Sequence, residues 1–191
     1  MIQNKKIILA SGSPRRQEIL AQAGFKFEII VRPTTEHFSE NELLEKVPEI
    51  LAKEKAEQFP EIGEDTIVIS ADTVVIANQT ILNKPQNRQE AIEMLTLLQN
   101  NTHKVVTGVC IKNGDNFDVF SDTTEVRFSP ISNAEIEYYV DAYKPFDKAG
   151  AYGVQEFIGM IGIDKIEGSF YTVMGLPIHK VYQKLKPFIS I

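Results

Sequence analysis

The sequence is poor in cysteine and lacks any long hydrophobic run. Its single cysteine, Cys110, lies in the apolar stretch 105–111, so no disulfide can form within the chain and a small buried core residue is expected. No apolar stretch approaches the about 20 residues that a membrane-spanning helix needs, and the first residues show no cleavable leader pattern. These absences predict a cytoplasmic protein with no membrane partner.

Motifs of several enzyme classes are also missing. Neither a G-x-x-x-x-G-K-[ST] loop nor a G-x-G-x-x-G fingerprint occurs, which argues against kinase and ATPase machinery. His37, His103 and His179 show no metal-binding spacing, so a zinc site is not expected. No G-x-S-x-G elbow supports a serine nucleophile.

An excess of positive charge is absent as well. The 20 Lys and Arg residues are outnumbered by 26 Asp and Glu residues, giving a formal net charge of −6 that disfavours broad nucleic-acid binding. With 191 residues and 43% hydrophobic content, the chain is long enough to bury a full core. Its length predicts one domain, or two lobes that share one sheet.

The basic charge that is present includes an adjacent pair just after the first apolar strand. The run IILASGSPRRQEIL, residues 7–20, contains a turn-forming glycine, two hydroxyls, a proline suited to the first helical position and two forked guanidinium donors, supplied by Ser11, Gly12, Ser13, Pro14, Arg15 and Arg16. The free N–H groups and positive dipole end of a helix start favour an anion. Ordinary helix capping would use similar residues, but the combination indicates a phosphate receptor.

The order of the expected elements predicts an α/β fold. The apolar opening, a helix over residues 14–23 and an alternating strand over 25–31 make a strand–helix–strand start. Further helices are expected over 42–59, interrupted or restarted at Pro48, and over 88–98.

Hairpins predict that the sheet is mixed. The expected strands cover residues 66–70, 74–77, 80–82, 103–112 and 117–128. Asp72 is expected in a break between the first two, and a small hairpin around Asn78-Gln79 should join the second and third. Asn113-Gly114 should join the last two as antiparallel neighbours.

The final third combines helices with many glycines. Ser132 and Glu135 form a capping-box pattern before a helix, and a last helix is expected over 177–185. The glycine-rich stretch 150–175 between them favours tight turns and close ligand approach over regular helix.

Four further polar residues are candidates for chemistry. Asp72 follows an apolar strand, where α/β folds commonly present a working carboxylate, although a turn-capping aspartate would look the same. Lys84 is held extended before Pro85, which suits a directed ammonium, whereas Lys55 is one of two lysines on a helix. Glu36 follows a Thr-Thr pair and suits either a metal site or an exposed loop.

Eight short motifs, in their order along nearly the entire chain, together resemble the Maf family of nucleoside triphosphate pyrophosphatases. They are SGSPRR at 11–16, Glu36, EKA at 54–56, ADTVV at 71–75, NKP at 83–85, THKVVTGV at 102–109, DKAGAYGVQ at 147–155 and GLP at 175–177.

The resemblance implies a role for each matching residue. Asp72 would be the catalytic proton acceptor, and substrates would be distinguished by Arg15, Thr73 and Gln155. Mg²⁺ or Mn²⁺ would be held by Glu36 and Asp72. The phosphates would be gripped by Ser11, Ser13, Arg15, Arg16, Lys55 and Lys84.

The resemblance also implies a substrate and a fold. The three specificity positions resemble the branch that acts on dTTP and UTP, although residues 170–172 depart from the Tyr and Asn of many members. Hydrolysis would yield a monophosphate and pyrophosphate, limit incorporation of non-standard nucleotides and be linked to cell division arrest. The implied fold is a single domain over residues 1–191 of the Maf and inosine triphosphatase type. It has a mixed twisted sheet, flanking helices and a cleft between two lobes, and a homodimer is the implied assembly.

Two alternatives remain open from the sequence. One is a pyrophosphatase for 7-methyl-GTP or another modified base. The other is a nucleotide-binding regulator of septum formation without significant turnover.

Overall fold

A computed structural model of the chain describes residues 1–35, 38–39 and 42–191. Its contacts divide into two compact units. The first unit comprises residues 1–72, 107–122 and 175–191, and the second comprises residues 73–106 and 123–174. Three long strands, β4 (Thr66–Ala77), β6 (Thr102–Asn113) and β7 (Asn116–Phe128), contribute residues to both units.

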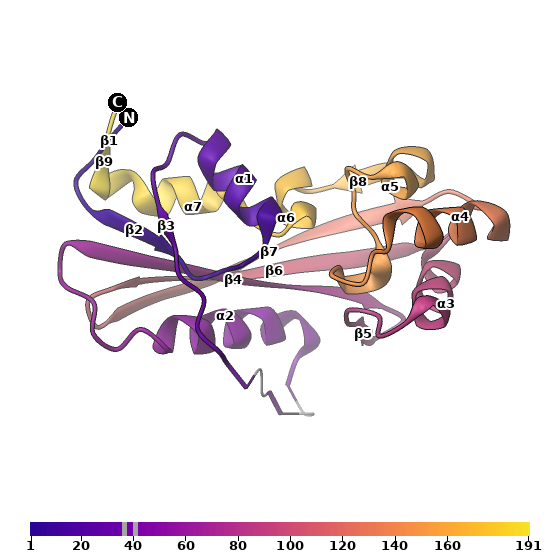
Figure 1. The fold of residues 1–191 in the computed structure, drawn as a ribbon, viewed down its shortest axis with the longest axis horizontal. Helices are drawn as coiled ribbons and strands as arrows, with labels where there is room; N and C mark the ends of the chain where they lie inside the picture. Colours follow the sequence, from indigo (N-terminus) through magenta and orange to yellow (C-terminus); the bar gives the residue numbers. More distant parts are fainter. Residues whose placement is uncertain (36–37, 40–41) are drawn as a thin grey trace. The chain divides into compact units, whose positions relative to one another are not determined.

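Strands and helices alternate along much of the chain, as the α/β prediction requires (Figure 1). The other strands are β1 (Ile2–Gln3), β2 (Lys6–Leu9), β3 (Glu28–Ile29), β5 (Thr80–Leu82), β8 (Ile163–Glu167) and β9 (Ile189–Ser190). The helices are α1 (Pro14–Gln22), α2 (Val47–Glu57), α3 (Arg88–Leu98), α4 (Asn133–Tyr143), α5 (Phe157–Gly162), α6 (Phe170–Met174) and α7 (Ile178–Leu185). Short 3₁₀ turns cover η1 (Leu44–Lys46), η2 (Ala149–Ala151) and η3 (Lys186–Phe188).

The sheet is mixed, as expected. Its strand order is β3-β2-β4-β6-β7-β8, with β5 paired to β4, and β1 and β9 form a separate small pair. Strand β2 runs parallel to β3 and β4, whereas the β4–β5 and β7–β8 pairs are antiparallel. The prediction of a mixed sheet with flanking helices is confirmed.

In the first unit, helix α1 begins where its sequence predicts. Pro14 occupies the first turn, where its missing N–H is not needed, and Ser13 precedes it in an extended conformation. Gly24 follows the helix with φ +85°, a conformation that glycine adopts without strain. Helix α1 buries Ile19 and Leu20, and Figure 1 shows α1 and α7 on one side of this unit's strands with α2 on the other.

Helix α2 restarts at its proline, one of the two alternatives expected. The 3₁₀ turn η1 leads into the helix, and Pro48 is its second residue, which requires no hydrogen-bond donor. Ala52 and Ala56 are fully buried and pack with Cys110 of β6, as expected for a buried thiol. The backbones are so close that a Cβ on Gly108 would lie 2.2 Å from the carbonyl carbon of Pro48.

Two strand predictions for this unit were wrong. The alternating segment 25–31 forms only the two-residue strand β3, which pairs solely with the last residues of β2. Asp72 lies inside the continuous strand β4 instead of in a break. Strand β4 pairs with β2 over residues 66–69 and with β5 over residues 75–77, and β6 is its hydrogen-bonded neighbour on the other side of the sheet.

The second unit has its own hydrophobic core, in which α3 and α4 pack together. The predicted hairpin around Asn78-Gln79 is present between β4 and β5, and both turn residues have positive φ angles. The capping box of Ser132 and Glu135 is present at the start of α4. The β6–β7 turn comprises residues 114–115, one position later than expected, and Gly114 adopts φ +58°.

The glycine-rich stretch is more regular than the sequence predicts. Gly159 and Gly162 lie inside helix α5, whereas Gly150, Gly168 and Gly175 have the positive φ angles expected of tight turns. A Cβ on Gly159 would lie 2.4 Å from the carbonyl oxygen of Val154. At Gly159, the glycine therefore allows close approach of the chain's own backbone.

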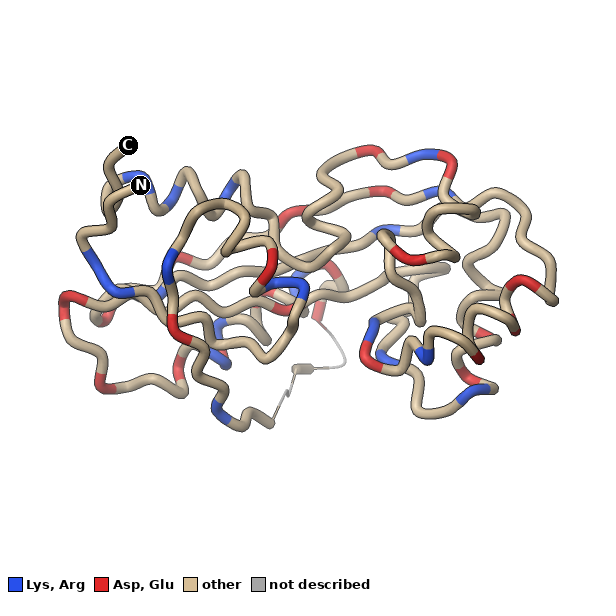
Figure 2. Tube along the Cα trace, turned by 45° about the horizontal axis from the view of Figure 1, so that its top comes forward, with Lys and Arg blue, Asp and Glu red and all other residues tan. Residues whose placement is uncertain are grey.

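Lys and Arg occur along both units together with Asp and Glu (Figure 2). Among the described residues, no helix combines the length and apolar character required to cross a membrane.

Candidate functional site

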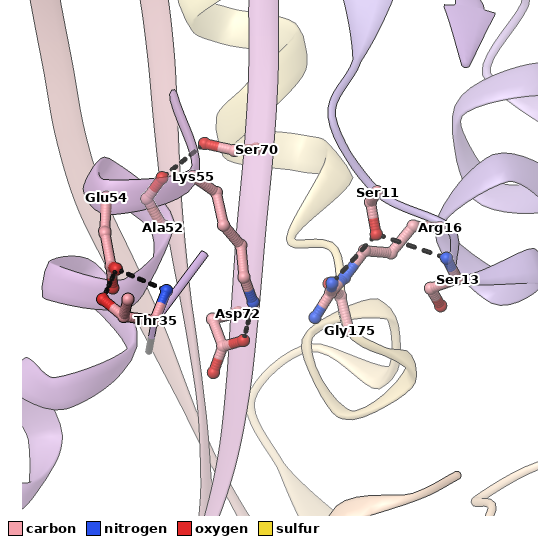
Figure 3. Close-up of polar contacts among 10 residues, drawn as sticks. All are labelled: Ser11, Ser13, Arg16, Thr35, Ala52, Glu54, Lys55, Ser70, Asp72 and Gly175. Carbon is pink, nitrogen blue, oxygen red and sulfur yellow. Dashed lines mark hydrogen bonds and ion pairs between the residues drawn. The ribbon is translucent and has the colours of Figure 1, made fainter. Parts of the chain in front are cut away.

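In the first unit, the turn between β2 and α1 is braced by Arg16. Its Nε donates to the carbonyl oxygen of Gly175 at 2.8 Å, and its Nη1 donates to Ser11 Oγ at 3.1 Å (Figure 3). The Ser11 hydroxyl also accepts from the backbone N–H of Ser13 at 3.3 Å. A permanent positive charge is thereby held beside the start of α1, where the helix dipole is also positive. Arg15, the residue before Arg16 in the same helix, is half-buried.

The strand register places Ser11 and Asp72 at similar levels in the sheet. Leu9, the last residue of β2, is the parallel partner of Ile69, and the N–H of Ala10 donates to the carbonyl oxygen of Ile69 at 2.8 Å. Ser11 follows Leu9 by two residues, and Asp72 follows Ile69 by three. The register therefore sets Asp72, inside β4, at about the level of the turn that follows the carboxyl end of β2.

Asp72 forms an ion pair with Lys55. Lys55 Nζ lies 2.5 Å from Asp72 Oδ1, and each side chain is 17% exposed (Figure 3). The alignment of α2 on β4 is reinforced by Ser70, whose buried hydroxyl donates to the carbonyl oxygen of Ala52 at 2.6 Å. Lys55, which was predicted to bind phosphate, is thus in direct contact with Asp72, which was predicted to be catalytic, within one unit.

Glu54 is a further polar residue of this region that no individual prediction singled out. Its Oε1 accepts from the N–H of Thr35 at 3.0 Å and from the Thr35 hydroxyl at 2.7 Å. These bonds tie the segment after β3 to α2. The signal in the sequence that could have identified Glu54 is its place in the EKA motif at 54–56, next to Lys55. Glu36 and His37, which follow Thr35, lie outside the described residues.

The side chains present show whether this region could hold a divalent cation. The described residues include no group of three His, Cys, Asp or Glu side chains arranged to hold a metal ion. Asp72 is a partly exposed carboxylate at the level of the turn between β2 and α1. Mg²⁺ is commonly held by one or two carboxylates plus substrate phosphates and water. The chemistry of this single carboxylate fits that mode of binding.

The second unit contains the other three predicted site residues. Thr73 is half-buried in β4, whereas Lys84 and Gln155 are exposed. The N–H of Gly150 donates to the carbonyl oxygen of Asn83 at 3.2 Å, which links the segment that carries Lys84 to the one that leads to Gln155. The structure therefore connects these two polar segments, which are far apart in the sequence.

Comparison with known proteins places this arrangement in a family. A family model described as Maf-like protein matches residues 6–188. A dTTP/UTP pyrophosphatase of Porphyromonas gingivalis strain W83 is 48% identical over 98% of this chain and 96% of its own. Proteins of the same description from Cytophaga hutchinsonii and Christiangramia forsetii are 45% and 44% identical, over 99% and 100% of this chain and 87% and 97% of their own.

A solved structure extends the comparison to the fold. The Ham1 protein of Staphylococcus aureus superposes with a TM-score of 0.51 at 15% identity, over 95% of this chain and all of that one. That likeness concerns the fold alone. The match of the family model to residues 6–188, together with relatives at 44–48% identity, shows that this chain belongs to the Maf family.

Proposed function

We propose that this chain is a nucleoside triphosphate pyrophosphatase that hydrolyses dTTP and UTP to the monophosphate and pyrophosphate. Its near full-length relatives carry that description, and they are 44–48% identical to it. The observation that carries the proposal is the β2–β4 register, which sets Asp72, paired with Lys55, level with the arginine-rich start of α1.

The basic groups of the first unit suit the phosphates. The positive dipole end of α1 and the guanidinium of Arg16, both at the start of this helix, suit anionic oxygens. The residues proposed to bind phosphate are Ser11, Ser13, Arg15, Arg16, Lys55 and Lys84. Neutralising the negative charge on the departing pyrophosphate is the main electrostatic task of such a site.

Asp72 is proposed as the general base. A water oxygen bonds to the α-phosphorus, the bond from that phosphorus to the bridging oxygen breaks, and the water proton passes to the Asp72 carboxylate. Lys55 would orient that carboxylate through the 2.5 Å ion pair. Mg²⁺ or Mn²⁺, when bound, supplies charge neutralisation on the phosphate oxygens, and Glu36 and Asp72 are the carboxylates proposed to hold it.

Base selection is proposed to depend on the second unit's Gln155. Its side-chain amide offers both a donor and an acceptor, which match N3 and O4 of thymine or uracil. Arg15 and Thr73 are the two other residues proposed to distinguish substrates.

The proposed activity also suggests where the enzyme acts and what it does in the cell. Free nucleoside triphosphates are cytoplasmic, so we propose that the enzyme acts there and limits incorporation of non-standard nucleotides, with a link to cell division arrest. The extent of the family match supports one catalytic domain over residues 1–191. A homodimer remains the expected assembly.

The decisive experiment is pyrophosphate release by the purified protein with Mg²⁺ or Mn²⁺ across dTTP, UTP, CTP, 7-methyl-GTP and unmodified purine triphosphates. We expect rapid cleavage of dTTP and UTP. Asp72→Asn should lower turnover at least about a hundredfold while leaving dTTP binding largely intact. Activity on 7-methyl-GTP alone would assign the chain to another branch, and tightly bound intact nucleotide would favour a regulator.

A further inference from the structure

Gln155 occupies a β-turn whose two ends are both hydrogen-bonded. The turn runs from Gly153 to Glu156 and is closed by a bond from the N–H of Glu156 to the carbonyl oxygen of Gly153 at 3.0 Å. Within it, Val154 is buried and Gln155 is exposed. The conformation of this turn therefore sets where the Gln155 side chain leaves the protein surface.

One buried hydroxyl contacts both ends of the turn. Tyr139 of α4 accepts from the N–H of Gly153 at 3.1 Å and donates to Glu156 Oε2. Its donor and one of its acceptor positions are thus both used on this four-residue segment. Burial, reinforced by the bond to the carboxylate, raises the pKa of the Tyr139 hydroxyl, so it remains a donor at neutral pH.

The second oxygen of the same carboxylate is also engaged. Lys148 Nζ lies 3.1 Å from Glu156 Oε1 and 2.7 Å from Asp147 Oδ1, and the Lys148 side chain is only 9% exposed. The Glu156 side chain is therefore held by an ammonium on one oxygen and by the Tyr139 hydroxyl on the other.

The packing around the turn leaves little space for another conformation. A Cβ on Gly153 would lie 2.7 Å from the carboxyl carbon of Glu156. On the other side, a Cβ on Gly159 would lie 2.6 Å from the carbonyl oxygen of Gly153. The turn is thus enclosed by α5, by its own glutamate and by the tyrosine of α4.

We infer that Tyr139 and Glu156 are positioning residues for base selection, which hold the Gly153–Glu156 turn so that Gln155 presents its amide to the pyrimidine. This inference rests on the proposed function, because it concerns how the same substrate is selected. It assigns a role in specificity to two residues that would not themselves contact the nucleotide.

The test is Tyr139→Phe, which removes only the hydroxyl, with kcat and KM measured for dTTP and CTP. Cytosine carries an amino group where thymine has O4, so the ratio of kcat/KM values for these substrates reports Gln155's selection. We expect that ratio to fall about ten- to a hundredfold, mainly through a higher KM for dTTP, because small displacements of a positioning group have effects of this size.

A double-mutant cycle distinguishes positioning from general structural damage. In a Gln155→Ala background, Tyr139→Phe should leave the dTTP to CTP ratio unchanged, because the residue through which it acts is gone. Tyr138→Phe is the matched control, since this neighbour on α4 is 57% exposed, and it should retain the wild-type ratio. Circular dichroism and thermal unfolding establish that each variant is folded.

Glu156→Gln provides a second test if Tyr139→Phe fails to fold. It keeps an acceptor for the hydroxyl but removes the charge facing Lys148, and it should also lower the ratio. Folded variants with the wild-type ratio would overturn the inference while leaving the proposed function intact. An equal fall in the Gln155→Ala background would also overturn it. A wild-type protein that releases no pyrophosphate from any triphosphate would instead refute the proposed function, and this inference with it.

Discussion

Lys55 Nζ and Asp72 Oδ1 lie 2.5 Å apart, joining α2 to β4 within the first unit. The two residues are 17 positions apart in the sequence, and both side chains are largely shielded from water. An ion pair with this degree of burial depends on geometry more than an exposed pair does, because solvent screens it less. Its position level with the arginine-rich turn is the basis for the proposed chemistry.

Replacing Lys55 by Met should impair both function and stability. The Asp72 carboxylate would lose its charged partner, and we expect kcat/KM for dTTP to fall at least about tenfold, with a loss of about 1–3 kcal/mol in the free energy of unfolding. Steady-state kinetics and urea unfolding measure the two effects.

Lys53→Met is the matched control on the same helix. Lys53 is 49% exposed and pairs with Glu57 at 3.5 Å, so this variant should change stability by less than about 0.5 kcal/mol and leave activity unchanged. Equal effects of the two substitutions would contradict a specific role for the Lys55–Asp72 pair.

His103 should make the protein less stable in mild acid. Burial lowers the pKa of His103 to about 4 from its usual 6.5, and its Nε2 lies 2.8 Å from the buried Tyr152 hydroxyl. Between these pH values the unfolded chain binds the proton more readily than the folded protein. The contribution of His103 to the free energy of unfolding is therefore fully present above pH 6.5. It is lost as the pH falls toward 4, which lowers the free energy of unfolding by about 3 kcal/mol.

Urea unfolding at several pH values between 7.5 and 4.5 tests this expectation. In His103→Gln the decrease should be shallower, since the titrating group has been removed. His179→Gln, at a side chain that is 52% exposed, should retain the wild-type slope. Parallel pH profiles for all three proteins would rule out this role for His103.

Gly159→Ala should destabilise the protein even though alanine favours helix. The new methyl group would lie 2.4 Å from the carbonyl oxygen of Val154, which forces α5 away from the turn that carries Gln155. We expect a loss of about 1–3 kcal/mol, the usual range for overpacking, and a lower kcat/KM for dTTP. Thermal unfolding and steady-state kinetics provide the readouts.

Met160→Ala is the comparison, because Met160 is the next residue of α5 and is 69% exposed. It should change stability by less than about 0.5 kcal/mol. A Gly159→Ala variant as stable as Met160→Ala would show that α5 can shift without loss.

Much of the fold could be predicted because its signals are local. The start of α1 at Pro14, the capping box of Ser132 and Glu135 and the hairpin turn at Asn78-Gln79 each depend on a few consecutive residues. Backbone preferences and short-range hydrogen bonds act over that distance, so a sequence pattern can identify them. The family resemblance, spread over eight motifs, was confirmed by the family model.

The continuity of β4 through Asp72 could not be predicted from local sequence patterns. Asp72 was expected in a break, yet the strand is continuous and has hydrogen-bonded neighbours in β2, β5 and β6. Such pairing depends on residues that are distant in the sequence, and local propensity does not record it.

By itself, the sequence determined the α/β order, the helix starts, the hairpin turns and the family, because each follows from short patterns or from their order. Only the tertiary structure decided that Lys55, and not Lys53, meets Asp72, and that Tyr139 holds both ends of the turn around Gln155. Those choices arise from packing between elements, such as Ala52 and Ala56 against Cys110. Packing at this level depends on the whole fold, since each contact requires both of its elements to be in place.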